Sequence, residues 1–204
     1  MGQVIPERSD RSCDSKRMAR PEKTVNRKTL LAAIALAALA ASLAVPTVAA
    51  ASKAGFGFNA TDIRGFRTGA VSLSGGGAFD PVTGIAHLGG GFSCLEDVGQ
   101  GPLAGCLAGQ GVRWDTAHLL RSTTFKCTGA ATEALKSAVI SPTTAVIQAD
   151  FYRAGDANDE SFTAQIIVSQ DDLDPDLPGV QKVWVQGVGC GSAVGKFATE
   201  GSAE

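Results

Sequence analysis

Two stretches in the second half of the chain alternate apolar and polar residues with a period of two. Within 145–152 the residues on one side are Ala145, Ile147, Ala149 and Phe151, and within 161–169 they are Phe162, Ala164, Ile166 and Val168. This period is typical of a β-strand with one buried face. Segment 182–188 predicts a third strand, with Val183 and Val185 facing away from Trp184, Gln186 and Val188.

A glycine-rich stretch at 69–94 predicts a β-hairpin. Runs 74–79 and 88–92 flank the turn sequence Asp80-Pro81-Val82-Thr83-Gly84. A turn centred on Val82 would set Gly75 opposite Gly89 and Gly77 near His87. Such facing glycines leave a strip without side chains, which favours close packing or strong twist, with a ligand groove as the alternative.

The remaining pattern favours an all-β fold. Trp114, on an expected strand at 112–118, and Trp184 are predicted core or inter-sheet residues, with exposed sugar-binding aromatics as the alternative. Segment 132–139 fits a short helix with Glu133 and Lys136 in contact, and equally a strand. We expect an antiparallel β-sandwich or jelly roll of seven to nine strands, and a closed barrel stays open as an alternative.

The N-terminal region predicts export. In 30–45, fifteen of sixteen residues are Ala, Leu, Ile or Val; basic residues precede this run, and 48–50 supplies small residues for cleavage. We expect a leader and signal peptide at 1–50, with Met18 as a possible true start and an uncleaved anchor as the alternative reading. A lead-in at 51–68 and a single β domain with a short flexible tail at 69–204 would follow.

Charge and cysteine content narrow the function class. Residues 51–204 contain ten Lys/Arg and sixteen Asp/Glu, a net charge near −6 that argues against nucleic-acid binding. Their four cysteines, an even number suited to an oxidising compartment, predict disulfides. Three connectivities exist, and we favour Cys94–Cys106, closing the loop 95–105, with Cys127–Cys190, tying a middle strand to a late one. The sequence contains no C-x₂-C pair, so we do not expect these cysteines to bind zinc.

Acidic residues are the main candidates for ligand chemistry. The seven carboxylates are Asp156, Asp159, Glu160, Asp171, Asp172, Asp174 and Asp176. The strand at 161–169 would separate them into two groups by roughly 30 Å. Asp156, Asn158 and Glu160 form a candidate calcium turn, with a plain solvated loop preferred, and no other cofactor is expected. Segment 171–179 fits a polar turn made rigid by two prolines.

Catalytic constellations are weak in this sequence. His87 and His118 are expected to be surface or structural histidines, and neither a G-x-S-x-G nor an H-E-x-x-H motif is present. We therefore assign no catalytic residue.

The stretch 148–153, continuing through 158–164 and 183–191, resembles small secreted bacterial Gly-rich β-sandwich proteins, a hypothetical-protein family of unknown function. The Ser-Gly-Gly-Gly-Ala-Phe strand at 74–79 is similar to theirs, and the resemblance implies no activity. We expect an exported, non-catalytic envelope or secreted protein, a binding or structural module for an envelope or extracellular component, without stable membrane insertion after signal cleavage. The alternative is a secreted glycoside-type hydrolase with carboxylates from separate strands.

Overall fold

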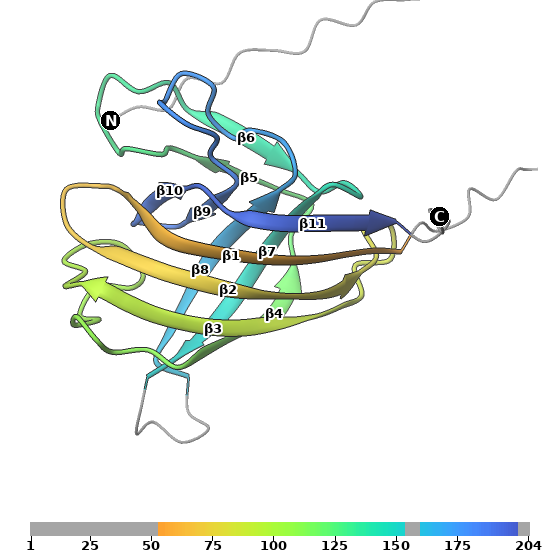
Figure 1. Ribbon diagram of the computed structural model, residues 1–204, viewed down its shortest axis with the longest axis horizontal. Coiled ribbons are helices and arrows are strands. Elements are labelled where there is room, and N and C mark those ends of the chain that lie inside the picture. Colours follow the sequence, from red (N-terminus) through yellow and green to blue (C-terminus); the bar gives the residue numbers. More distant parts are fainter. Residues whose placement is uncertain (1–52, 154–159, 200–204) are drawn as a thin grey trace, which may run out of the picture. The chain divides into compact units, whose positions relative to one another are not determined.

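The computed structural model describes residues 53–153 and 160–199, all within a unit that spans Ala49–Glu204. These residues form strands and no helix, so none of them belongs to a helix that could span a membrane. The strands are β1 (Ala54–Gly65), β2 (Ala70–Phe79), β3 (Ala86–Glu96), β4 (Arg113–Leu119), β5 (Ser122–Phe125), β6 (Lys136–Val139), β7 (Thr144–Tyr152), β8 (Phe162–Ser169), β9 (Val183–Val185), β10 (Gly189–Gly191) and β11 (Val194–Thr199) (Figure 1).

Eight of the strands close into an antiparallel barrel. Their order is β1-β2-β3-β4-β7-β8-β9-β10, and β10 pairs back onto β1 through Arg64↔Cys190 and Gly65↔Gly189. The other half of the same β1 edge pairs with β11, an additional ninth strand. The all-β, antiparallel prediction is confirmed, whereas the expected sandwich or jelly roll is wrong. Alternation alone did not separate these folds, because strands of either kind bury one face.

The predicted lead-in at 51–68 needs correction, because it contains β1. Phe56, Phe58 and Ala60 of this strand are buried, with exposed residues between them, which is a period of two. Glycines at 55 and 57 obscured that period in the sequence. The β domain therefore begins well before Gly69, and the predicted leader and C-terminal tail lie outside the described residues.

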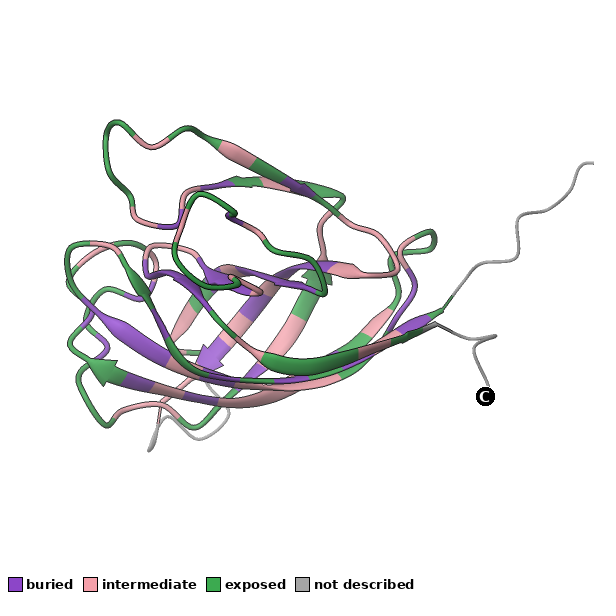
Figure 2. Ribbon diagram, turned by 45° about the horizontal axis from the view of Figure 1, so that its top comes forward, coloured by how far each residue is buried: buried purple, intermediate pink, exposed green. Residues whose placement is uncertain are grey.

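Aromatic side chains fill the barrel interior where the strands carry glycine. Phe58 is paired with Gly75, and Trp114 with Gly90. Trp114 is fully buried and donates its indole N–H to the Ser74 carbonyl oxygen at 2.9 Å. The glycines of the hairpin thus allow close packing, which was the preferred interpretation of the strip without side chains. Figure 2 shows buried residues alternating with more exposed ones along the strands.

The β2–β3 hairpin forms, but its register differs by one residue from the expectation. Gly76 lies opposite Gly89, and Gly77 opposite Leu88, instead of Gly75 opposite Gly89. The Asp80 carboxylate accepts the amides of Val82 at 2.8 Å and Thr83 at 3.2 Å. The Asp80 amide also donates to Ile85. The turn is therefore centred between Val82 and Thr83 and not on Val82. The Asp80 carboxylate holds the turn in this form by binding two of its amides, which the residue types of the turn did not specify.

A second layer covers part of the outer barrel face. Strands β5 and β6 form a two-stranded sheet, so segment 132–139 ends as a strand rather than a helix. Phe125 and Ala138 of this hairpin pack on Val146, Ile167 and Trp184, which point away from the barrel interior. Trp184 is 3% exposed and donates its indole N–H to the Lys126 carbonyl oxygen at 2.8 Å. Both tryptophans are therefore packing residues, as predicted.

Two disulfides join the residues that the spacing favoured. Cys94–Cys106 closes the loop after β3, with 6.3 Å between the Cα atoms. Cys127–Cys190, with 4.8 Å between the Cα atoms, joins the hairpin to β10. Cys127 lies just after β5 rather than on a strand, so this bond fastens the outer layer to the barrel. Both bonds are compatible with an oxidising extracellular or periplasmic location.

Candidate binding site

A groove with a volume of about 440 Å³ lies beside the β5–β6 hairpin. Strand β6 forms one wall, and loop 171–176, which follows β8, forms the other. Thr144 and Ser169, whose hydroxyl oxygens are 3.1 Å apart, lie at the point where β7 begins and β8 ends. We call this surface the hairpin groove; it is formed by Phe125, 136–139, Thr144, Ser169, 171–173, Pro175 and Asp176.

Hydrogen bonds from the loop to itself hold the acidic wall in place. One Asp172 carboxylate oxygen accepts the amides of Asp174 at 3.1 Å and Gln181 at 2.9 Å. Asp174 in turn accepts the amide of Asp176 at 3.3 Å. The segment is therefore an ordered polar turn, as predicted. Asp174 differs from the other carboxylates of this loop, which are exposed to solvent, because it is only 1% exposed.

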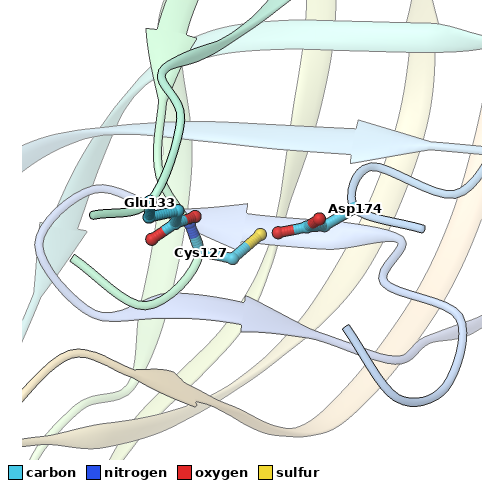
Figure 3. Close-up of side chains that lie close together, drawn as sticks. All are labelled: Cys127, Glu133 and Asp174. Atoms are coloured by element: carbon cyan, nitrogen blue, oxygen red, sulfur yellow. The ribbon is translucent and has the colours of Figure 1, made fainter. Parts of the chain in front are cut away.

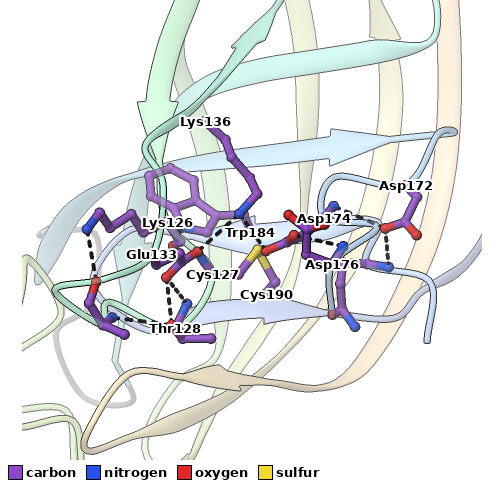
Figure 4. The surroundings of a disulfide bond; sticks show 12 residues. Lys126, Cys127, Thr128, Glu133, Lys136, Asp172, Asp174, Asp176, Trp184 and Cys190 are labelled. Atoms are coloured by element: carbon purple, nitrogen blue, oxygen red, sulfur yellow. Dashed lines mark hydrogen bonds and ion pairs between the residues drawn. A yellow bond between two sulfur atoms is a disulfide. The ribbon is translucent and has the colours of Figure 1, made fainter. Parts of the chain in front are cut away.

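Lys136 neutralises the buried Asp174. Its Nζ atom lies 2.9 Å from Oδ2 of Asp174 and 3.5 Å from Oε1 of Glu133 (Figure 4). The hydrogen bond to Asp174 raises the pKa of Lys136, which keeps this amine charged. A buried carboxylate is costly without such a partner. The ion pair thus joins β6 to the opposite wall of the groove.

Glu133 fixes the connection between β5 and β6. Its carboxylate accepts the amides of Cys127 at 2.6 Å and Thr128 at 2.9 Å, and the Thr128 hydroxyl at 2.6 Å. Burial alone would raise the pKa of Glu133, but the hydrogen bonds and Lys136 outweigh it and lower the pKa to about 2. Glu133 is therefore an anion near neutral pH with a structural role, the reverse of what a general acid requires.

Cys127, Glu133 and Asp174 form the one group of potential metal ligands found in the described part of the chain, with their ligand atoms within 4.8 Å of one another (Figure 3). The Cys127 sulfur is already bonded to Cys190, and the carboxylates already accept the hydrogen bonds described above. These residues do not fit a metal ion, because no thiolate and no free carboxylate face remain.

The calcium prediction stays untested. Asp156 and Asn158 lie outside the described residues. Glu160 is exposed, and its carboxylate accepts a hydrogen bond from the Thr163 hydroxyl. Strand β8 separates this region from loop 171–176, as expected.

The barrel also brings together two carboxylates that the sequence did not pair. Asp115 of β4 and Asp150 of β7 lie directly opposite each other in the register. The alternation placed Asp150 on the polar face of its strand, but nothing in the sequence indicated that β4 pairs with β7. His87 and His118, by contrast, are exposed on β3 and β4, in line with the expected surface positions.

Lys136 and Asp174 were also missed as partners. The sequence pointed to Glu133 and Lys136 as neighbours, and the structure places them in contact. The sequence did contain one sign that Asp174 is buried, since this residue lies between the apolar Leu173 and Pro175 in an otherwise acidic stretch. That signal did not identify Lys136, because β7 and β8 lie between the two residues in sequence.

These observations define an antiparallel eight-stranded barrel with a disulfide-tethered outer hairpin and an acidic groove beside it. No family model, no curated protein and no solved structure matches this chain. The resemblance to secreted bacterial Gly-rich proteins therefore remains a prediction from the sequence.

Proposed function

We propose that this protein is an exported, non-catalytic binding module of the bacterial envelope or exterior, and that it holds its ligand in the hairpin groove. The observation that carries the proposal is the groove itself, whose walls are fixed by the Lys136–Asp174 ion pair and the Cys127–Cys190 disulfide. A rigid concave site with a few placed polar groups suits binding.

Export is part of the proposal. The basic and apolar leader at 1–50 and two disulfides in a domain of this size support a periplasmic or secreted location. Within the barrel, aromatic side chains fill the centre, which favours the outer surface as the place of recognition.

The second candidate is a secreted glycoside-type hydrolase, and the Asp115–Asp150 pair favours it. Directly opposed residues in an antiparallel sheet have Cβ atoms roughly 5 Å apart, close to the carboxyl separation in retaining glycosidases. Asp115 is, however, in an ion pair with Arg113 at 3.1 Å on the outer surface. The hairpin groove is a concave site with a volume of about 440 Å³, so binding there is the preferred function.

Co-sedimentation of the purified oxidised protein with isolated cell-envelope fragments tests the binding function. We expect wild type to co-sediment and the Asp171→Asn/Asp176→Asn variant to lose most of this binding. Asp62→Asn/Glu96→Gln is the matched control, because it removes two exposed carboxylates that pair with Arg64 and do not line the groove. Equal loss in both double variants would argue against a site at the groove.

A panel of glycoside, ester and peptide substrates tests the hydrolase. Turnover that Asp115→Asn or Asp150→Asn abolishes would overturn the non-catalytic proposal.

A further inference from the structure

Strand β6 has one edge paired with β5 and one edge facing the hairpin groove. The Ile140 amide donates to the Arg121 carbonyl oxygen at 3.0 Å, which identifies these two as a hydrogen-bonded pair. Antiparallel pairs alternate, so the backbone groups of Lys136 and Ala138 also point to β5. Those of Ser137 and Val139 therefore point away from β5, and neither residue has a backbone hydrogen bond outside the β5–β6 ladder in the described residues.

The opposite wall of the groove carries uncompensated negative charge. Asp171, Asp172 and Asp176 are exposed and line the groove, and none of the described ion pairs includes them. The one cation of the groove lining, Lys136, is already held between Glu133 and Asp174. A ligand that enters the groove therefore meets a net negative surface, and the lining residues include no cation other than the paired Lys136.

Apolar side chains complete the groove. Phe125 and Leu173 line it together with Val139, which is 64% exposed. The groove thus combines unpaired backbone groups, carboxylates and an apolar rim. An extended peptide offers complementary groups for all three, since strand addition supplies backbone hydrogen bonds and alternate side chains enter pockets.

We propose that the hairpin groove binds an extended polypeptide segment that carries Lys or Arg, and that this segment adds a strand to the free edge of β6. This inference rests on the proposed binding function and specifies its ligand class. The four residues of β6 span about 13 Å, so the bound segment pairs over three or four residues. A divalent cation fits less well, because the carboxylates of the wall do not form a compact ligand set.

The probe for this inference is a five-residue peptide of alternating lysine and valine with blocked ends, titrated into the oxidised protein by calorimetry. We expect binding that weakens with added salt and weakens about tenfold in Asp171→Asn/Asp176→Asn, the effect of two lost charge pairs. Asp62→Asn/Glu96→Gln, with the same change in charge, should bind as wild type. The corresponding glutamate–valine peptide should not bind.

Val139→Pro tests the strand addition itself. Proline removes the Val139 amide, which points into the groove and not to β5, and proline is tolerated on edge strands. We expect peptide affinity to fall about fivefold or more, while Val139→Ala, which keeps the amide, changes it less than twofold. Thermal melting of both variants checks that the fold is intact. Should Val139→Pro fail to fold, a lysine–valine peptide N-methylated at alternate residues replaces it as the test.

Three results would overturn the inference: no binding of the lysine–valine peptide, binding unaffected by Val139→Pro (or by N-methylation, where that replaces it), or binding unaffected by Asp171→Asn/Asp176→Asn. Groove-dependent binding to envelope fragments alongside any of these results would leave the proposed function standing. Conversely, peptide binding without groove-dependent co-sedimentation would support the inference and contradict the envelope function.

Discussion

Lys136 is the residue on which the attachment of loop 171–176 to β6 depends. Lys136→Met leaves Asp174 buried without a cation, so we expect the free energy of unfolding to fall by about 3 kcal/mol. Replacing both partners, as Lys136→Met/Asp174→Leu, should recover most of that loss, because the fully buried carboxylate is removed together with its cation and Glu133 keeps its hydrogen bonds to Cys127 and Thr128. Urea unfolding of the three proteins measures the effect.

Lys196→Met is the control, since Lys196 is exposed on β11. A change within about 0.5 kcal/mol is expected there. Equal effects at positions 136 and 196 would contradict a stabilising role of the buried pair.

Packing requires glycine at position 90 but not at position 57. A Cβ atom at Gly90 would overlap the Ser74 carbonyl, whereas at Gly57 its nearest neighbour is the Gly75 carbonyl oxygen at 4.0 Å. We expect Gly90→Ala to lower the free energy of unfolding by about 2–3 kcal/mol and Gly57→Ala to change it by less than about 1 kcal/mol. Equal melting temperatures for the two variants would argue against the observed close approach of β2 and β3.

At the scale of elements, the Cys127–Cys190 disulfide holds the β5–β6 hairpin on the barrel. It closes a longer loop than Cys94–Cys106, with sequence separations of 63 and 12. Replacing each pair by serines should therefore cost roughly 4 and roughly 3 kcal/mol, respectively. The first variant should also shift Trp184 fluorescence toward that of exposed tryptophan under mild denaturant, before the barrel unfolds. Simultaneous loss of hairpin and barrel signals would contradict an independently attached hairpin.

Individual strands were easier to predict from the sequence than their arrangement. Strands β7 and β8 follow the predicted alternation, because each buries one face in the barrel. Closure depends on two residue pairs between β1 and β10, and such short pairing leaves no periodic signal. The hairpin register was wrong by one residue because Asp80 binds two amides of its own turn, a contact that turn composition does not specify.

The site was less accessible to sequence reasoning than the fold. Disulfide connectivity followed from spacing and compartment, and both bonds are present. The groove instead depends on the position of β6 relative to loop 171–176. That position is determined by the packing of Phe125 and Ala138 on the outer barrel face. Local sequence carries no information about that contact between distant segments.

For the whole molecule, Glu133 predicts a specific dependence of stability on pH. Its pKa is about 2 in the folded protein, below the ordinary value of 4.5. A lowered folded pKa stabilises the protein above the unfolded pKa, and this contribution is lost as pH falls from about 4.5 through about 2. The shift corresponds to at most about 3 kcal/mol, which solvent screening reduces to about 2 kcal/mol.

Urea unfolding between pH 2 and pH 6 measures this contribution. Glu133→Gln should be less stable than wild type at pH 6 and should show a shallower loss of stability on acidification. Parallel curves for the two proteins would contradict the assignment of Glu133 as a structural anion.

The central claim is that the protein binds its ligand at the hairpin groove. Amide hydrogen exchange of the oxidised protein, free and bound to isolated cell-envelope fragments, tests it most directly. The account predicts new protection at 136–139 and 171–176, with unchanged exchange along β4. Protection centred on the strands that carry Asp115 and Asp150, with the groove unchanged, would contradict it.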